Sequence, residues 1–128
     1  MADGKFVCVI NCMDGRTQLP AIDYLKAKYE ADYVDAVTEP GPVGCLSEKT
    51  DQAKIESIKA RVAISVEKHG AKHIAIVAHC DCAGNPCCDE DQHGQLKDAV
   101  EMVRSWGFDA DVIGLWIGGP DWEVSEMY

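Results

Sequence analysis

Short apolar runs, separated by segments in which apolar residues recur at helical spacing, mark out the chain. Residues 6–11 form a run rich in β-branched side chains, which predicts a first and buried strand. Residues 72–79, KHIAIVAH, form the strongest strand signal, because continuous apolar runs are typical of strands buried on both faces of a parallel sheet. Residues 32–40 and 109–119 predict two further strands, and residues 120–128 predict a last short strand or a tail.

Three segments repeat apolar residues at the spacing of an amphipathic helix. They cover residues 20–31, 51–69 and 94–107, and the acidic stretch just before the third predicts a solvated helix start. Proline suits the first turn of a helix, so Pro20 is expected to open the first of these helices. Glycine commonly follows a helix end, so Gly70 is expected to end the second.

The alternation of strands and helices predicts an α/β fold. Such alternation implies right-handed crossovers, and so a mainly parallel twisted β-sheet flanked by helices. The Pro-Gly-Pro sequence at residues 40–42 is expected only to stop the second strand. With no internal repeat and no linker, residues 1–128 are expected to form a single domain.

Composition and charge exclude several classes of partner. The chain has 22 acidic and 12 basic side chains, a formal net charge of −10, which argues against binding to nucleic acid or to an anionic membrane surface. No apolar run approaches the roughly 20 residues that span a bilayer. The N-terminal residues lack the pattern of a signal peptide, so a cytoplasmic protein acting on a small-molecule substrate is expected.

The chain contains seven cysteines, which in a reducing compartment serve as metal ligands, catalytic groups or small buried hydrophobes. Their positions distinguish these roles. Cys12 stands at the end of the first predicted strand, in VINCMDGR, and His79 ends the strongest one, in HCDC. In open α/β sheets, ligands bind outside the carboxyl ends of strands. If these two strands are neighbours, both motifs face one crevice.

The two motifs together carry the donor set of a zinc site. His79 and Cys82 can bind one ion from a tight turn, and Cys12 can add a third ligand across the crevice. Three protein ligands leave a fourth position open, which is typical of catalytic zinc. Asp14 is close enough to occupy that position or to accept a hydrogen bond from bound water. Arg16 can pair bidentately with Asp14 and hold it.

The pattern C-x-D-x-R after a first strand and H-x-x-C after a later one resembles the β-class carbonic anhydrases. The segments EKHGAKHIAIVAHCDC and GLWIGGPDWEV extend this resemblance over most of the chain, as a small and divergent member. It implies a β-carbonic-anhydrase-like fold, one Zn²⁺ per chain bound by Cys12, His79 and Cys82, and a homodimer or tetramer. It also implies a catalytic dyad of Asp14 and Arg16, with Asp14 a possible fourth zinc ligand in a closed, inactive state.

The activity implied by this resemblance is that of a zinc lyase, the reversible hydration of carbon dioxide to bicarbonate. Zinc would lower the pKa of its bound water toward ~7 and give a hydroxide that attacks CO₂. Two features depart from the family. No glutamine precedes Gln18, and the loop TEPGPVG at residues 38–44 replaces one that contains asparagine and glycine. Two alternatives therefore stay open: a zinc hydrolase of carbonyl sulfide or carbon disulfide, and a catalytically weak zinc-binding or redox-sensing module.

A rival metal site and several plainer roles also follow from the sequence. The rival set lies within one loop and consists of Cys82, Cys87, Cys88 and His93. Cys8 stands four residues before Cys12, about 13 Å along a strand, and is therefore expected in the core. Asp81 is expected to hold the turn through backbone hydrogen bonds. The three tryptophans, Trp106, Trp116 and Trp122, are expected in the core or at an interface.

Overall fold

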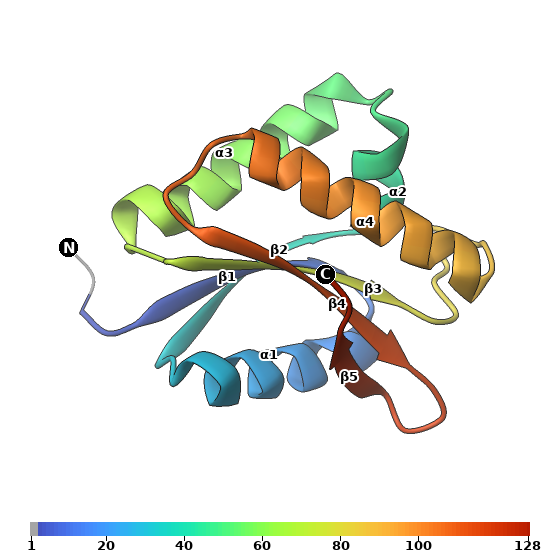
Figure 1. Ribbon diagram of the computed structural model, residues 1–128, viewed down its shortest axis with the longest axis horizontal. Coiled ribbons are helices and arrows are strands. Elements are labelled where there is room, and N and C mark those ends of the chain that lie inside the picture. The colour runs from blue at the N-terminus through green and yellow to red at the C-terminus, as the bar shows by residue number, and fades with distance from the viewer. Residues whose placement is uncertain (1–2) are drawn as a thin grey trace.

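A five-stranded β-sheet with the strand order β2-β1-β3-β4-β5 forms the middle layer of the molecule (Figure 1). The computed structural model describes residues 3–128. In chain order, the elements are β1 (Phe6–Cys12), α1 (Gly15–Tyr29), β2 (Tyr33–Glu39), α2 (Pro42–Glu48), α3 (Gln52–Lys68), β3 (His73–His79), α4 (Asp89–Ser105), β4 (Asp111–Gly118) and β5 (Glu123–Glu126). Strands β1 to β4 run parallel, and β5 is antiparallel to β4. The predicted α/β class with a mainly parallel sheet is confirmed.

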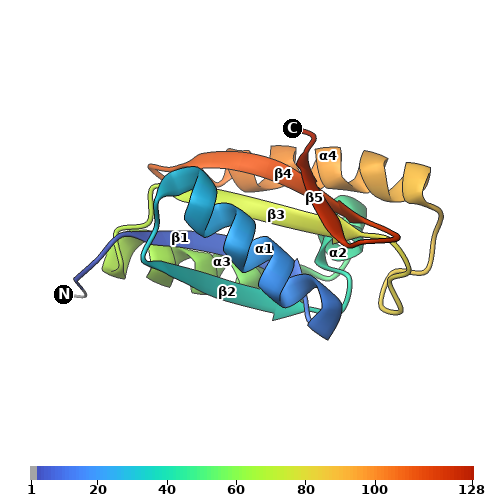
Figure 2. The ribbon, with the colours of Figure 1, turned by 90° about the horizontal axis from the view of Figure 1, so that it is seen from below.

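Helix α1 covers one face of the sheet, and helices α2, α3 and α4 cover the other (Figure 2). The interior strand β1, which lies between β2 and β3, contributes side chains to both layers. Val7 and Val9 pack with Leu25 of α1, whereas Cys8 and Ile10 belong to the core on the opposite face. Because both faces are buried, the strand is apolar at every position except Asn11, which is itself buried. Full burial of a side chain such as Ile10 contributes about 1.5–3 kcal/mol.

The order of the connections reverses between β1 and β3. The chain passes from β1 to β2 through α1 on one face and returns to β3 through α2 and α3 on the other. Strands β1 and β3 are hydrogen-bonded neighbours, with Cys8 beside Ile74 and Ile10 beside Ile76. Cys12 ends β1 and His79 ends β3, so both residues lie at the switch point, where α/β sheets bind ligands.

Helix α1 begins five residues earlier than the sequence pattern predicts. The Asp14 side chain caps it by accepting a hydrogen bond of 2.9 Å from the backbone N–H of Arg16. Pro20 therefore lies inside the helix rather than in its first turn, which is a correction to the prediction. The proline ring removes one intrahelical hydrogen bond there. The cap places Asp14 and Arg16 together at the start of α1.

Helix α2 was not predicted. Pro42 opens it at the first helical position, and Gly41 precedes it with a φ of 57°, which suits glycine. The Pro-Gly-Pro sequence is thus both the end of β2 and the start of a helix. Helix α4 begins at Asp89, so the acidic stretch does form a helix start, as predicted. Acidic side chains in a first turn favour the helix macrodipole.

The helices are amphipathic and bury one side each. Helix α3 buries Ile55, Ile58 and Val62, as its spacing predicts. Helix α4 buries Leu96 and Val100 against the same face of the sheet. None of the helices within residues 3–128 combines the length and the apolar character that crossing a membrane requires.

Candidate metal centre

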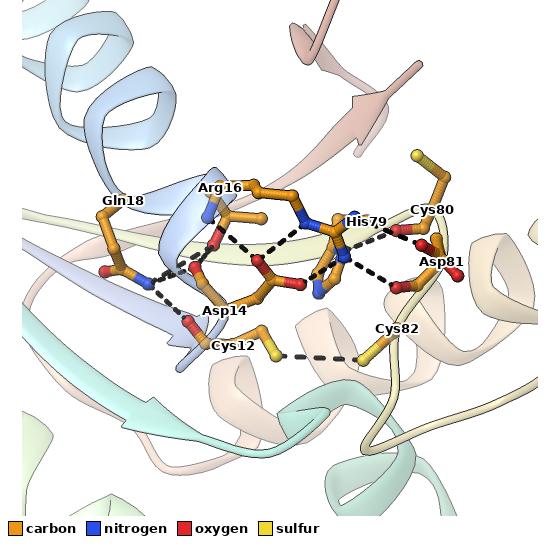
Figure 3. A network of polar contacts seen from close by, with 9 residues as sticks. Cys12, Asp14, Arg16, Gln18, His79, Cys80, Asp81 and Cys82 are labelled. Atoms are coloured by element: carbon orange, nitrogen blue, oxygen red, sulfur yellow. Dashed lines mark hydrogen bonds and ion pairs between the residues drawn. The ribbon is translucent and has the colours of Figure 1, made fainter. Parts of the chain in front are cut away.

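Three potential ligand atoms meet at the carboxyl ends of β1 and β3. The Sγ atoms of Cys12 and Cys82 and a ring nitrogen of His79 all lie within 4.8 Å of one another (Figure 3). The exposed fractions of the three residues are 4%, 5% and 1%, in that order. The Cys12 ligand comes from the last position of β1, and the other two come from the end of β3 and the tight turn that follows it.

His79 presents an imidazole nitrogen with a free lone pair to this cluster. Its Nδ1 atom lies 2.7 Å from the carbonyl oxygen of Cys80. Because a carbonyl oxygen only accepts, Nδ1 carries the proton and Nε2 is the unprotonated nitrogen. Nε2 is buried and has no hydrogen-bond partner. An orphaned imidazole nitrogen beside two thiols is what a metal site requires, and the contact to the carbonyl fixes the tautomer, as in metal-bound histidines.

The two thiols are spaced as ligands of one ion. The Sγ atoms of Cys12 and Cys82 are 3.8 Å apart. Two Zn–S bonds of about 2.3 Å at a tetrahedral angle separate their sulfurs by about 3.8 Å. Burial, together with the neighbouring Cys12 thiol, raises the pKa of Cys82 to about 11. A bound cation reverses this effect, because it stabilises both thiolates. Two sulfurs and one imidazole nitrogen therefore fit zinc.

Asp14 and Arg16 form a bidentate ion pair beside the cluster. Arg16 donates from Nε to Oδ1 of Asp14 at 3.0 Å and from Nη2 to Oδ2 at 2.7 Å. These hydrogen bonds lower the pKa of Asp14 to about 2. Both carboxylate oxygens of Asp14 are thus turned toward Arg16, and Asp14 is not a member of the three-ligand cluster.

Contacts of Arg16 with two further residues, Asp81 and Trp122, were not predicted. Its Nη1 donates to Oδ2 of Asp81 at 3.2 Å, and its Nη2 donates to the Asp81 carbonyl oxygen at 3.1 Å. The ring of Trp122 lies 4.4 Å from the guanidinium carbon. The Asp81 carboxylate therefore bonds to Arg16, where backbone contacts within the turn were expected. Trp122 packs partly on the core, as expected, but it also contacts the site.

Gln18 holds the segment from Cys12 to Asp14 in place. Its Nε2 atom donates to the carbonyl oxygens of Cys12 and Asp14, both at 2.8 Å. One side chain thereby ties the end of β1 to the cap of α1. This role of Gln18 was not predicted, because a helix that starts at Pro20 would leave Gln18 in the preceding loop. If the helix had been predicted to begin at Gly15, Gln18 would have been expected in its first turn, close to the end of β1.

A cavity of about 260 Å³ opens beside the cluster and is lined by Cys12, Met13, Asp14, Pro40, Ala83 and Gly84. Its wall is formed by the loop between β3 and α4, residues 80–88, here called the metal loop, and by the segment after β2. The two segments touch so closely that a Cβ atom on Gly84 would lie 2.7 Å from the backbone of Pro40. Glu39 does not line this cavity and pairs instead with Arg61 of α3. The cavity suits a small molecule with little polarity.

The rival loop site is not assembled. Across residues 3–128, Cys12, His79 and Cys82 are the one group with metal-ligand spacing. Cys87 instead faces Gln95, with its Sγ atom 3.8 Å from Oε1. His93 packs edge-on against Trp116, at a ring separation of 4.4 Å. Cys8 is fully buried in the core, as predicted.

Comparisons with known proteins identify the family and the fold. A family model described as "Putative carbonic anhydrase" matches residues 2–128. Among solved structures, the fold is similar to a carbonic anhydrase from Streptococcus mutans, with a TM-score of 0.64 and 15% identity over 95% of this chain and 81% of that one. It is also similar to a carbonic anhydrase from Glaciozyma antarctica, with a TM-score of 0.59 and 12% identity over 94% and 80%. No curated protein matches the chain.

The two structural likenesses, at 15% and 12% identity, show the fold alone. The family match shows that the chain is a member of the family, because the matched segment extends from residue 2 to residue 128. The β-class motifs found in the sequence lie within that match, at the switch point of the sheet. The protein therefore belongs to the carbonic anhydrase family, as a member of β-class-like type.

Proposed function

We propose that this protein is a zinc-dependent lyase that catalyses the reversible hydration of carbon dioxide to bicarbonate. The observation that carries the proposal is the buried, unpartnered Nε2 atom of His79, which faces two cysteine sulfurs beside a small cavity. Cys12, His79 and Cys82 would hold one zinc ion per chain. Membership of the carbonic anhydrase family supports this reaction over other zinc chemistry.

Zinc at this site would supply a water molecule of lowered pKa, and so a nucleophile at neutral pH. The chain's own residues orient the reaction. Asp14 stays ionised at neutral pH because Arg16 lowers its pKa to about 2, so it can accept a hydrogen bond from the attacking water. Arg16 holds that carboxylate in one orientation.

The cavity would admit the substrate and limit access of bulk water. Met13, Pro40 and Ala83 contribute apolar atoms to its lining. A linear molecule without charge, such as CO₂, fits this chemistry. The reaction consumes one water and one CO₂ and releases bicarbonate and one proton to the solvent.

A second candidate function is the hydrolysis of carbonyl sulfide or carbon disulfide. The same lining favours it, because these molecules are also small, linear and uncharged. The segment from Thr38 to Gly44, which differs from the usual family loop, contributes Pro40 to the wall of the cavity. Substrate selection would therefore depend on this wall, while the metal ligands serve both reactions.

The seven cysteines are all unpaired in the described structure, and two of them, Cys12 and Cys82, belong to the proposed ligand set. Such thiols persist in the reducing cytoplasm, which supports a cytoplasmic location.

We also infer a dimer or tetramer, because Met13 and Leu19, which follow β1, expose 63% and 69% of their surface. A partner subunit that covers these two side chains would bury apolar surface beside the site.

The decisive experiment is stopped-flow measurement of CO₂ hydration by the zinc-loaded protein, with metal content determined on the same sample. Turnover well above the uncatalysed rate, lost in His79→Ala, would support the proposal. Cys80→Ala is the matched control, since Cys80 lies next to a ligand but outside the cluster. Turnover of carbonyl sulfide without CO₂ hydration would favour the second function. Reversible thiol oxidation without turnover of either substrate would indicate a redox module.

A further inference from the structure

The guanidinium group of Arg16 is held by three separate segments of the chain. Asp14 binds it from the start of α1, Asp81 binds it from the metal loop, and Trp122 covers it from the turn between β4 and β5. Arg16 and Asp81 are 65 positions apart in the sequence. Figure 3 shows the guanidinium between the two carboxylates, with hydrogen bonds to each.

These contacts restrict the guanidinium plane from different directions. Nε and Nη2 point to Asp14, Nη1 and Nη2 point to Asp81, and the indole lies 4.4 Å from the central carbon. A single exposed ion pair would restrain an arginine weakly, and 47% of the Arg16 side chain is exposed. Contacts on two edges, together with an aromatic ring, leave the guanidinium little freedom to turn.

The orientation of Arg16 decides where the Asp14 carboxylate points. Both oxygens of Asp14 bond to Arg16, and the carboxylate lies outside the ligand cluster. Asp14 is nevertheless only two residues from Cys12. If Arg16 turned away, the carboxylate would be free to approach the fourth position of a metal at the site. Whatever holds Arg16 therefore also keeps that position accessible.

We propose that Asp81 and Trp122 are positioning residues, which hold Arg16 and through it keep Asp14 away from the fourth metal position. The inference rests on the proposed zinc site, and it adds a role for the turn between β4 and β5. Trp122 also lies near the metal ligand His79, at a ring separation of 6.1 Å. The Trp122 indole therefore lies near both Arg16 and His79.

The test uses Trp122→Leu, which keeps an apolar side chain but removes the aromatic face, and Trp122→Phe, which restores a ring. Asp81→Asn removes the charge yet keeps the backbone carbonyl contact, and asparagine tolerates the positive φ of 53° at this position. Glu126→Gln is the matched control. It breaks the ion pair of Lys28 with Glu126, which also joins α1 to β5, without touching Arg16.

The first measurement is azide binding to the cobalt-substituted protein, followed by its visible absorption. Azide reports on the accessibility of the fourth metal position and does not depend on catalysis. Trp122→Leu should weaken azide binding by about 2- to 30-fold at unchanged cobalt content, and Asp81→Asn by about 1.5- to 5-fold. Trp122→Phe should recover most of the affinity, and Glu126→Gln should bind azide like the wild type.

A double variant separates positioning from general damage. With Asp14→Ala in the background, no carboxylate can enter the fourth position, so Trp122→Leu should cause no further loss of azide affinity. An equal loss in both backgrounds would overturn the inference, as would wild-type azide binding in both Trp122→Leu and Asp81→Asn.

A second measurement needs no metal, which separates this inference from the proposed function. In ¹H–¹⁵N spectra of the metal-free protein, the Arg16 Nε–H should exchange with water about 2- to 30-fold faster in Trp122→Leu than in the wild type. Unchanged exchange would show that Trp122 does not hold Arg16. A wild-type protein that binds neither cobalt nor zinc would refute the proposed function, and with it the role toward the metal, even if the exchange rate rose.

Discussion

The Nδ1–H group of His79 donates a hydrogen bond of 2.7 Å to the backbone carbonyl of its neighbour Cys80. This contact leaves the buried Nε2 atom as the only basic nitrogen of the ring, facing the Cys12 and Cys82 sulfurs. A buried polar atom without a partner is costly unless a ligand completes it. A metal ion bound to Nε2 would remove this cost.

Zinc content should depend on the three clustered residues. Single changes Cys12→Ala, His79→Ala and Cys82→Ala should each reduce bound zinc from about one per chain to a small fraction, because two ligands bind zinc far less tightly than three. Inductively coupled plasma mass spectrometry of the purified variants measures this. Cys87→Ala, outside the cluster, is the control and should keep its zinc. Full retention of zinc in Cys12→Ala would favour the loop set of cysteines instead.

Turnover should depend on the ion pair of Asp14 and Arg16 even where zinc is retained. Asp14→Ala should lower kcat/KM for CO₂ hydration by ~10²–10⁴, the usual effect of losing a positioned acid or base. Arg16→Lys should also be impaired, because one ammonium group cannot reproduce the two bonds from Nε and Nη2. Glu67→Gln, an exposed change on α3, serves as the control in the stopped-flow assay. Wild-type turnover in Asp14→Ala would mean that the pair has only a structural role.

The close contact of Gly84 with Pro40 should make this glycine indispensable. A Cβ atom at Gly84 would lie 2.7 Å from the Pro40 backbone, so Gly84→Ala must displace the metal loop or the segment after β2. We expect a loss of about 1–3 kcal/mol in unfolding free energy and weaker zinc binding. Gly94→Ala is a matched control, because a Cβ atom there meets nothing within 4 Å. Gly94 lies inside α4, so its replacement should stabilise the protein by about 0.5–1 kcal/mol in urea denaturation.

Assembly should depend on the apolar surface next to the site. Light scattering at micromolar concentration should detect a dimer or tetramer, and Leu19→Asp should shift it toward the monomer, because Leu19 exposes 69% of its surface. Ile64→Asp, an exposed apolar position on α3, should leave the assembly unchanged. A wild-type monomer that still hydrates CO₂ would contradict this prediction.

Stability should fall at alkaline pH because of Cys8. Burial raises the pKa of its thiol to about 12 in the folded protein, against about 8.5 in an unfolded chain. Below about pH 8.5 the thiol is protonated in both states, so stability is fully retained. As the pH rises toward 12, only the unfolded chain loses the proton, which costs up to about 1.4 kcal/mol per pH unit.

Urea denaturation at pH 8 and pH 10 under reducing conditions tests the Cys8 prediction. Cys8→Ala should reduce the difference in unfolding free energy between the two pH values. Val9→Ala is the control, because it creates a comparable buried defect without an ionisable group and should lower stability equally at both. An unchanged pH difference in Cys8→Ala would exclude Cys8 as the cause.

The sequence by itself determined the class of fold and the composition of the candidate metal cluster. Strands β1 and β3 were predicted because burial on both faces requires apolar residues throughout, a pattern visible without a structure. Cys12, His79 and Cys82 were identified because their residue types and their places at strand ends restrict the chemistry.

Only the tertiary structure decided how the chain surrounds that cluster. The Asp14 cap, at the end of a strand whose position the sheet fixes, sets the start of α1 at Gly15 and leaves Pro20 inside the helix, against the usual preference of proline for the first turn. The contacts of Asp81 and Trp122 with Arg16 join positions far apart in the chain. Such contacts cannot be predicted from hydrophobic periodicity. The periodicity indicates which face of a helix or strand is buried, but it does not indicate which polar side chains from distant segments meet.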